Sequence, residues 1–250
     1  ADVTQCRDWF IFMISIAAAT TAQGAEKLRL PGIKGADDRQ LIRSDEAMWR
    51  PIGRVNSRLG GYCTGTLIAP RTVLTAAHCL WNKKTQKWLP TRTLHFVAGY
   101  RQGEYVAESK ITAMRIAEGF TYKDRASYGQ SSSSGPSKDW ALLTLAKDIS
   151  TITGTIPLAV APFDGENTLV QAGYSQDKPH MLTVHHGCRR LQTDRKRRLI
   201  KHNCDAVRGD SGSPILIRRD GIFVVLALHV ATTKPSQGET KGIAVLAPFE

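Results

Sequence analysis

Two short motifs in the sequence supply a serine and a histidine suited to acting together. The first is Gly209-Asp210-Ser211-Gly212-Ser213-Pro214, and the second is Thr75-Ala76-Ala77-His78-Cys79, in which His78 precedes Ser211 by 133 positions. The flanking glycines let the chain turn sharply and expose the hydroxyl, while the amides of Gly209 and Ser211 can point at one developing oxyanion. A serine hydroxyl is a poor nucleophile at neutral pH unless an imidazole takes its proton. The two motifs therefore predict acyl-transfer chemistry with Ser211 as the nucleophile and His78 as its base.

A carboxylate is expected to hold the imidazole in one tautomer, and eight aspartates lie between His78 and Ser211. Asp139 leads directly into Trp140-Ala141-Leu142-Leu143-Thr144-Leu145, an apolar run typical of a buried strand, so its carboxylate would be desolvated where that strand begins. Five others lie in turn-like segments or in a cationic run, which favours solvated loop positions. These are Asp124, Asp148, Asp164, Asp177 and Asp194. We expect Asp139 to orient His78.

The order His78, Asp139, Ser211, with these flanking residues, resembles the chymotrypsin-like (trypsin-like) serine endopeptidases over most of the chain. Two further segments, 37–42 (Asp-Asp-Arg-Gln-Leu-Ile) and 173–179 (Gly-Tyr-Ser-Gln-Asp-Lys-Pro), are similar to the bacterial glutamyl endopeptidase branch of that family. The Gly-Ser-Pro ending of the serine motif is similar to that branch as well. The resemblance implies an endopeptidase that acts on protein or peptide substrates through an acyl-enzyme, with no cofactor and no metal.

Short apolar segments of strand length recur along the chain, and helix-like segments are few. Examples are 94–98, 156–160, 169–172, 214–217 and 222–227. This pattern predicts an all-β protein and fits a sandwich and a barrel equally well. The family resemblance implies two packed six-stranded antiparallel β-barrels, residues 49–155 with His78 and Asp139 and residues 156–250 with Ser211. Catalysis is then expected in the cleft between the barrels.

The beginning of the chain has features of an export signal. Residues 9–19 are apolar and are followed by the small residues of 20–24, so we expect residues 1–24 to be a signal peptide and residues 25–48 an N-terminal or pro segment. Arg7 is the one positive charge before the apolar stretch, and a buried N-terminal helix is the alternative. No apolar run is long enough to predict a membrane span. The expected location is secreted or periplasmic.

Four of the five cysteines form two pairs with the same separation of 16 residues. They are Cys63 with Cys79, and Cys188 with Cys204. The family resemblance implies a disulfide in each pair, one clamping the histidine and one clamping the loop that leads to the serine. Cys6 would leave with the signal peptide, which resolves the odd count. Neither a Cys-x-x-Cys pair nor a wider His-Cys cluster is present, so no zinc site is expected.

The chain is basic, with a formal net charge of +12, and much of the excess lies between Cys188 and Cys204. The residues concerned are Arg189, Arg190, Arg195, Lys196, Arg197, Arg198 and Lys201. Such a loop can steer polyanions or acidic substrates toward the cleft, although most basic runs of this kind are simply solvated. Because no aromatic residues are interleaved, a nucleic-acid partner is not expected. A non-catalytic protease homologue that binds polyanions through this loop is the alternative function.

Three residues give conflicting indications of substrate preference. Asp205 lies six residues before Ser211, where the resemblance to trypsin places a carboxylate at the floor of the primary pocket and implies cleavage after Arg or Lys. His229 and Thr232 lie where the glutamyl branch places a histidine and a hydroxyl that bind a substrate carboxylate. If Asp205 faced His229, the two would pair and neutralise both preferences. Asp205 next to Cys204 can also simply accept hydrogen bonds from loop amides. The balance favours Arg or Lys, with Glu or Asp as the second choice.

Asp210 also has two interpretations. As the trypsin resemblance implies, it can receive a salt bridge from a new N-terminal amine after cleavage between Lys27 and Arg43. Alternatively, it hydrogen-bonds locally. The sequence leaves both open.

Overall fold

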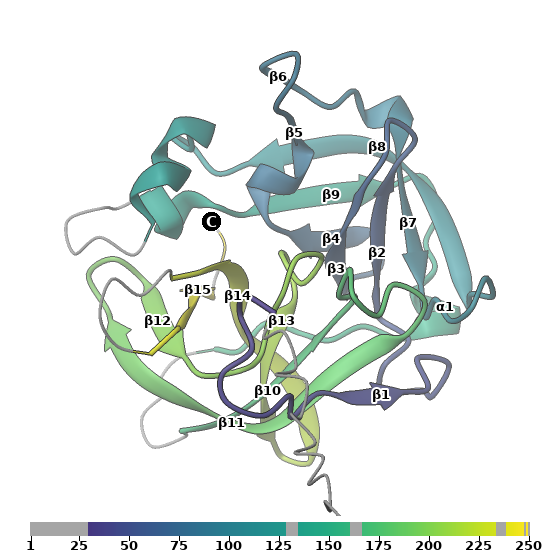
Figure 1. Ribbon diagram of the computed structural model, residues 1–250. Helices are drawn as coiled ribbons and strands as arrows, with labels where there is room; N and C mark the ends of the chain where they lie inside the picture. The colour runs from purple at the N-terminus through teal and green to yellow at the C-terminus, as the bar shows by residue number, and fades with distance from the viewer. Residues whose placement is uncertain (1–29, 129–134, 161–166, 234–238, 248, 250) are drawn as a thin grey trace, which may run out of the picture.

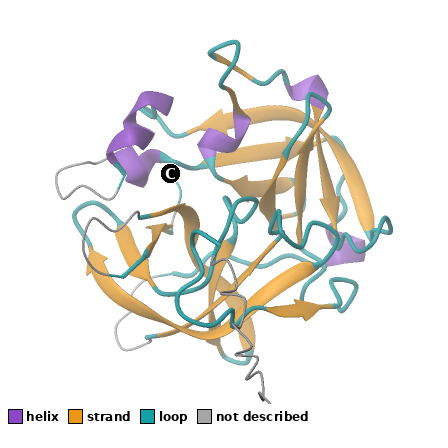
Figure 2. Cartoon of the chain, in the orientation of Figure 1, coloured by secondary structure: helices purple, strands orange, loops and turns teal. Residues whose placement is uncertain are grey.

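The computed structural model describes residues 30–128, 135–160, 167–233, 239–247 and 249. Within them the regular structure is β-strand, apart from short 3-10 turns and one four-residue α-helix, α1 (Ser150–Thr153) (Figure 1, Figure 2). None of the helices in these residues has the length and apolar character needed to cross a membrane. The expected signal peptide, residues 1–24, and Cys6 lie outside the described residues.

Six antiparallel strands close into the first barrel, drawn in blue and teal in the upper part of Figure 1. In order around the barrel they are β2 (Ile52–Ser57), β3 (Tyr62–Ala69), β4 (Thr72–Thr75), β9 (Ala141–Leu145), β8 (Ala107–Ile116) and β7 (Leu94–Ala98). At the start of β8 buried and exposed residues alternate, as expected of a strand with one face on the core. Leu67, Phe96 and Leu143 are fully buried in that core.

Six more strands form the second barrel, below the first in Figure 1. They are β11 (Leu182–Asp194), β10 (Thr168–Gly173), β13 (Pro214–Arg219), β14 (Ile222–Thr232), β15 (Gly242–Leu246) and β12 (Leu199–His202), and pairing of β11 with β12 closes the ring. A seventh strand, β1 (Gln40–Ile42), pairs antiparallel with Leu182–Val184 of β11. The prediction of two six-stranded antiparallel barrels is confirmed. Residues 40–42, ahead of the first barrel in sequence, thus belong to the sheet of the second.

Between the barrels the chain runs through α1 and residues 154–160. The strand expected at 156–160 is wrong, since Leu158 alone forms a β-bridge there, to Val225. Proline at position 157 has no N–H to give to a ladder, and the neighbouring amides bond to both barrels instead. Ile156 donates to the carbonyl of Leu67 and Ala159 to that of Val225. The segment therefore ties the barrels together rather than extending either sheet.

A shared apolar core lies where the barrels pack. It contains Trp49, Ile52, Leu74 and Trp140 from the first part of the chain and Tyr174, Leu182, Val225 and Leu228 from the second. Both expected disulfides are present, Cys63–Cys79 and Cys188–Cys204. The first joins β3 to the 3-10 turn η1 (Ala77–Leu80), and the second joins β11 to the segment that follows β12. The second bridge is buried in the core of the second barrel.

Candidate active site

His78 and Asp139 meet because of the register of two first-barrel strands. Thr75 at the end of β4 pairs with Ala141 at the start of β9. The residues just after Thr75 and just before Ala141 therefore leave the barrel at the same point. There η1 carries the imidazole, and the residue two places before Ala141 carries the carboxylate. The predicted strand after Asp139 is confirmed as β9.

The contact between the two side chains is close and buried. His78 Nδ1 lies 2.7 Å from Asp139 Oδ2, and the His78 amide donates to Asp139 Oδ1 at 2.9 Å. The Tyr128 hydroxyl donates to Oδ2 at 3.0 Å. Because a carboxylate accepts the Nδ1 proton, the tautomer leaves Nε2 as an acceptor. The aspartate thus fixes both the orientation of the ring and the nitrogen that can take a proton.

The pKa of each partner in this pair is set by burial and by the charge of the other partner. Burial lowers the pKa of His78 below its ordinary value, against the opposing charge of Asp139. Burial alone would raise the pKa of Asp139, but the charge and hydrogen bonds of His78 hold it below its ordinary value. The resting pair is therefore a neutral imidazole on an ionised carboxylate, which is the protonation state that a general base needs.

Ser211 lies on the second barrel's side of the junction, next to η1. The Thr64 amide of β3 donates to the Ser211 carbonyl at 3.0 Å, and Cys79 Sγ lies 3.9 Å from the same oxygen. Gly212 donates to the carbonyl of His229 at 2.8 Å. The Ser211 hydroxyl has no hydrogen-bond partner among the described residues. Its backbone is therefore held beside η1, and its hydroxyl makes no hydrogen bond to His78 in this structure.

The amides of Gly209 and Ser211 donate to no residue that the structure describes. Gly209 has φ of +95°, and a Cβ at this position would collide with the carbonyl oxygen of Tyr174. Only glycine fits such a conformation and approach without strain. Thr64 Oγ1 donates to the Gly209 carbonyl at 3.1 Å and holds the turn against β3. The site thus has two N–H groups that can receive an oxyanion.

Asp210 is buried behind this turn and bonds locally. Its Oδ2 accepts hydrogen bonds from Ser175 Oγ at 2.7 Å and from the Val207 amide at 2.9 Å. Ser175 Oγ in turn accepts from Arg39 at 2.9 Å, and Arg39 pairs with Asp177 at 2.7 Å. In this structure an internal guanidinium reaches Asp210 through one hydroxyl. Sequence reasoning noted the segments that carry Arg39, Ser175 and Asp177 but gave them no role.

Titration of Asp210 should make stability fall with rising pH over a defined window. Burial raises its pKa from about 4 to about 6, so between these values the folded chain keeps a proton that the unfolded chain has lost. Stability from this group is therefore fully present below pH 4 and is lost as the pH rises toward 6, by about 3 kcal/mol. Denaturant unfolding at several pH values, in a Ser211→Ala background to prevent autolysis, measures this. Asp210→Asn is the comparison, because its amide does not titrate. If the free energy of unfolding fell equally with pH in both proteins, the expectation would be contradicted.

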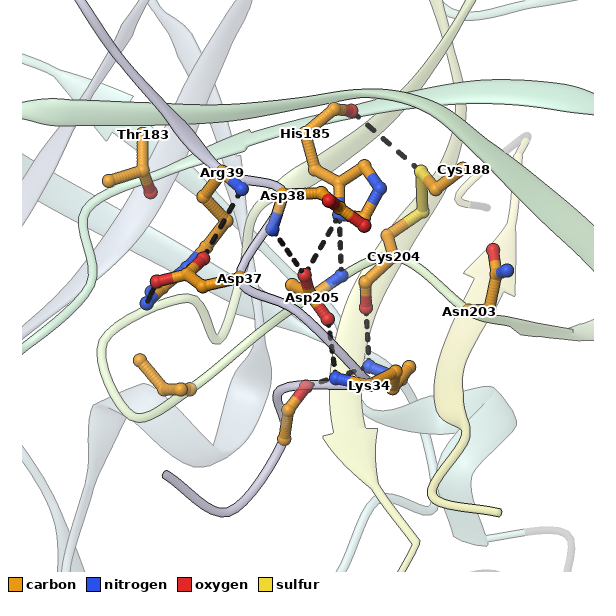
Figure 3. Close-up of polar contacts among 12 residues, drawn as sticks. Lys34, Asp37, Asp38, Arg39, Thr183, His185, Cys188, Asn203, Cys204 and Asp205 are labelled. Atoms are coloured by element: carbon orange, nitrogen blue, oxygen red, sulfur yellow. Dashed lines mark hydrogen bonds and ion pairs between the residues drawn. A yellow bond between two sulfur atoms is a disulfide. The ribbon is translucent and has the colours of Figure 1, made fainter. Parts of the chain in front are cut away.

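Asp205 points toward the N-terminal segment, as Figure 3 shows. Its Oδ1 accepts from the Lys34 amide at 2.7 Å, and its Oδ2 accepts from the Asp38 amide at 3.1 Å. His185 Nδ1 lies 3.4 Å from Oδ2 and accepts the Asp205 amide at 3.0 Å. The side chain is buried, and these three neighbours together hold its pKa below the ordinary value despite burial. The carboxylate thus accepts two loop amides, and the His185 ring lies beside it.

Two groups of side chains in the described residues have the spacing of metal ligands. One contains Cys63, His78 and Cys79, but both cysteines are joined in a disulfide. The other contains Asp38, His185 and Asp205. The Asp205 oxygens and the His185 Nδ1 already accept backbone N–H groups, so this group offers few free lone pairs to an ion. Neither group supports a metal role.

His229 lies on β14 in contact with a second buried histidine, His202 of β12. His202 Nε2 is 3.1 Å from His229 Nδ1, and the Cys204 amide donates to His202 Nδ1 at 3.2 Å. A Cβ on Gly242 of β15 would collide with the His202 ring, so this glycine makes room for it. Burial lowers the pKa of His229 to about 3 and that of His202 well below its ordinary value. Thr232, at the end of β14, is half-buried opposite Gly242.

The hydrogen bonds of this histidine pair determine where its protons lie. His202 Nδ1 accepts a hydrogen bond from the Cys204 amide, so Nε2 carries the ring hydrogen and donates to His229 Nδ1. His229 then carries its own hydrogen on Nε2, which has no partner among the described residues. The pair is a neutral relay that ends in one available N–H donor. No sequence signal marked His202.

Comparison with known proteins identifies a family for the chain. The sequence model of the Trypsin family matches residues 45–249. A glutamyl endopeptidase of Bacillus licheniformis is 33% identical over 66 residues, which make up 26% of this chain and 21% of that protein, so the match spans about a fifth of the relative.

Two solved structures share the fold. A Glu endopeptidase in complex with MPD has a TM-score of 0.68 at 20% identity, covering 86% of this chain and 93% of its own. The protease Anisep from Arthrobacter nicotinovorans has a TM-score of 0.60 at 17% identity, covering 82% and 92%. Since the family match runs through both barrels and includes His78, Asp139 and Ser211, the chain belongs to the Trypsin family.

Proposed function

We propose that the protein is a secreted or periplasmic serine endopeptidase that hydrolyses peptide bonds through an acyl-enzyme on Ser211. The observation that carries this proposal is the buried 2.7 Å contact between His78 Nδ1 and Asp139 Oδ2, with the Ser211 backbone held beside the turn that carries His78. Polyanion binding without catalysis, the alternative, gives no reason for a desolvated imidazole–carboxylate pair at this place. Membership of the Trypsin family and the two disulfides also support an exported protease.

In the proposed mechanism the proton moves between three groups. Ser211 Oγ attacks the carbonyl carbon of the peptide bond while His78 Nε2 takes the hydroxyl proton, and Asp139 stabilises the resulting imidazolium. The oxyanion accepts hydrogen bonds from the amides of Gly209 and Ser211. Collapse breaks the C–N bond, and His78 returns its proton to the leaving amine. Water then attacks the acyl-enzyme by the same route and releases the acid.

We propose further that the enzyme cleaves after acidic residues. His229 presents an N–H donor from the end of a neutral relay, and a carboxylate accepts from such a donor whereas a Lys or Arg side chain cannot. Asp205, the residue that would select Lys or Arg, accepts the Lys34 and Asp38 amides and lies beside His185. These contacts favour the second of the two preferences that the sequence left open. The relatives named as glutamyl and Glu endopeptidases fit it.

Peptide-library profiling tests the preference. We expect cleavage after Glu to exceed cleavage after Arg by about a hundredfold or more, because a site built to hydrogen-bond one group rejects substrates that lack it. His229→Ala should remove most of this advantage, because the relay then ends without its donor. Asp205→Ser should leave cleavage after Glu faster than cleavage after Arg. If cleavage after Arg dominates and disappears in Asp205→Ser, the preference belongs to Asp205 and the acidic assignment is wrong.

A further inference from the structure

The segment that precedes the first barrel packs directly against the residues leading to the serine. The Ala206 amide donates to the carbonyl of Gly32 at 3.2 Å. Lys34 Nζ donates to that same carbonyl at 2.9 Å and to the carbonyl of Cys204 at 2.5 Å (Figure 3). The Lys34 amide meanwhile binds Asp205. Residues 32–34 thus pack against residues 204–206, and the ammonium of Lys34 points toward the backbone there.

This ammonium connects to the histidine pair through Cys204. Lys34 Nζ binds the Cys204 carbonyl, the Cys204 amide binds His202, and His202 binds His229. Burial lowers the pKa of Lys34 to about 8, so the group is still mostly charged at neutral pH. Its charge in turn contributes to the lowered pKa values of His202 and His229. The positive charge of Lys34 therefore acts on His229, the residue whose Nε2–H is the donor at the end of the pair.

A neutral histidine pair leaves one requirement of an acid-selecting pocket unmet. Burying a carboxylate against a single N–H donor removes it from water without supplying an opposite charge, which is strongly unfavourable. Among the neighbouring charges, Lys34 lowers the pKa of His229 most, ahead of His78 and Arg125. Asp205 lies next to Lys34 and offsets part of its charge. The electrostatic potential at His229 thus depends on Lys34, whose own charge Asp205 partly offsets.

We propose that Lys34 is a specificity-determining residue, whose buried ammonium supplies the positive charge that lets the His202–His229 relay accept a substrate carboxylate. The proposal rests on the acidic preference proposed above. Asp205 then has the opposite effect to the one expected from its position in the sequence. It anchors the N-terminal segment and moderates the charge of Lys34, rather than binding a basic substrate.

The test compares two peptides that differ only in Glu or Gln before the cleaved bond, because this pair isolates the charge. In Lys34→Met the ratio of kcat/KM for Glu over Gln should fall at least about tenfold, with kcat/KM for the Gln peptide nearly unchanged. Asp205→Asn should raise the ratio, because it removes the offsetting charge. Lys110→Met is the matched control: Lys110 is an exposed lysine on β8, and its loss makes the same change in net charge.

Each outcome separates the two proposals. The ratio is internal to each protein, so partial unfolding of a variant lowers both rates and leaves it unchanged. A wild-type protein that cleaves Glu and Gln peptides equally would refute the acidic preference itself. A wild-type preference for Glu that persists in Lys34→Met, or equal losses for both peptides, would leave that preference standing and overturn the role of Lys34.

Discussion

Replacing Ser211 with alanine should lower kcat for peptide hydrolysis on the order of a millionfold, close to the background rate. The substitution removes one hydroxyl that makes no hydrogen bond within the described residues, so the fold should be unchanged. Circular dichroism and the denaturant midpoint check the fold, and a fluorogenic peptide assay measures the rate. His78→Ala should have nearly the same effect, because the proton of Ser211 then has no acceptor.

The double variant makes this prediction sharper. Because nucleophile and base act in one step, Ser211→Ala with His78→Ala should be scarcely slower than either single variant. Losses that add on a logarithmic scale would contradict a shared step. A Ser211→Ala protein that keeps a substantial part of the wild-type rate would place the chemistry elsewhere.

Asp139→Asn should lower kcat by about ten-thousandfold while preserving the shape of the site. An amide at this position can donate to His78 Nδ1, which would move the imidazole hydrogen to Nε2 and leave that nitrogen unable to take the Ser211 proton. Steady-state kinetics on the purified variant measures the loss. Tyr128→Phe is the matched control, because it removes a different hydrogen bond to the same Oδ2, at 3.0 Å, without changing the tautomer. It should slow the reaction only a few-fold; comparable losses in both variants would contradict the tautomer argument.

The residues that carry motifs were predictable from the sequence, and those that act through long-range packing were not. Asp139 could be chosen because the apolar run after it marks a buried strand. The two barrels, by contrast, came from family resemblance, since the strand pattern fitted a sandwich equally well. The strand expected at 156–160 failed because hydrophobicity alone does not show that an extended segment bonds to two different barrels.

The residues proposed to set the substrate preference show the same limit more clearly. Asp205 meets Lys34 and Asp38 across 171 and 167 residues, and no local pattern indicates these contacts. His202 on β12 and His229 on β14 lie on opposite sides of β15 in the sheet. Their rings meet across it because Gly242 of β15 has no side chain in the space that the His202 ring fills. The aspartate's place before the serine therefore favoured a basic preference, whereas the folded contacts favour an acidic one.

Labelling with a fluorophosphonate tests the central claim most directly, because the reagent phosphonylates a serine hydroxyl that a neighbouring base has activated. Mass spectrometry of the folded protein should find one adduct per chain, on the peptide that contains Ser211, with loss of peptidase activity in step. Heat-unfolded protein, Ser211→Ala and His78→Ala should all remain essentially unlabelled over the same time. A folded wild-type protein that takes up no label, or a label that persists at another serine in Ser211→Ala, would contradict the assignment of Ser211 as the activated nucleophile.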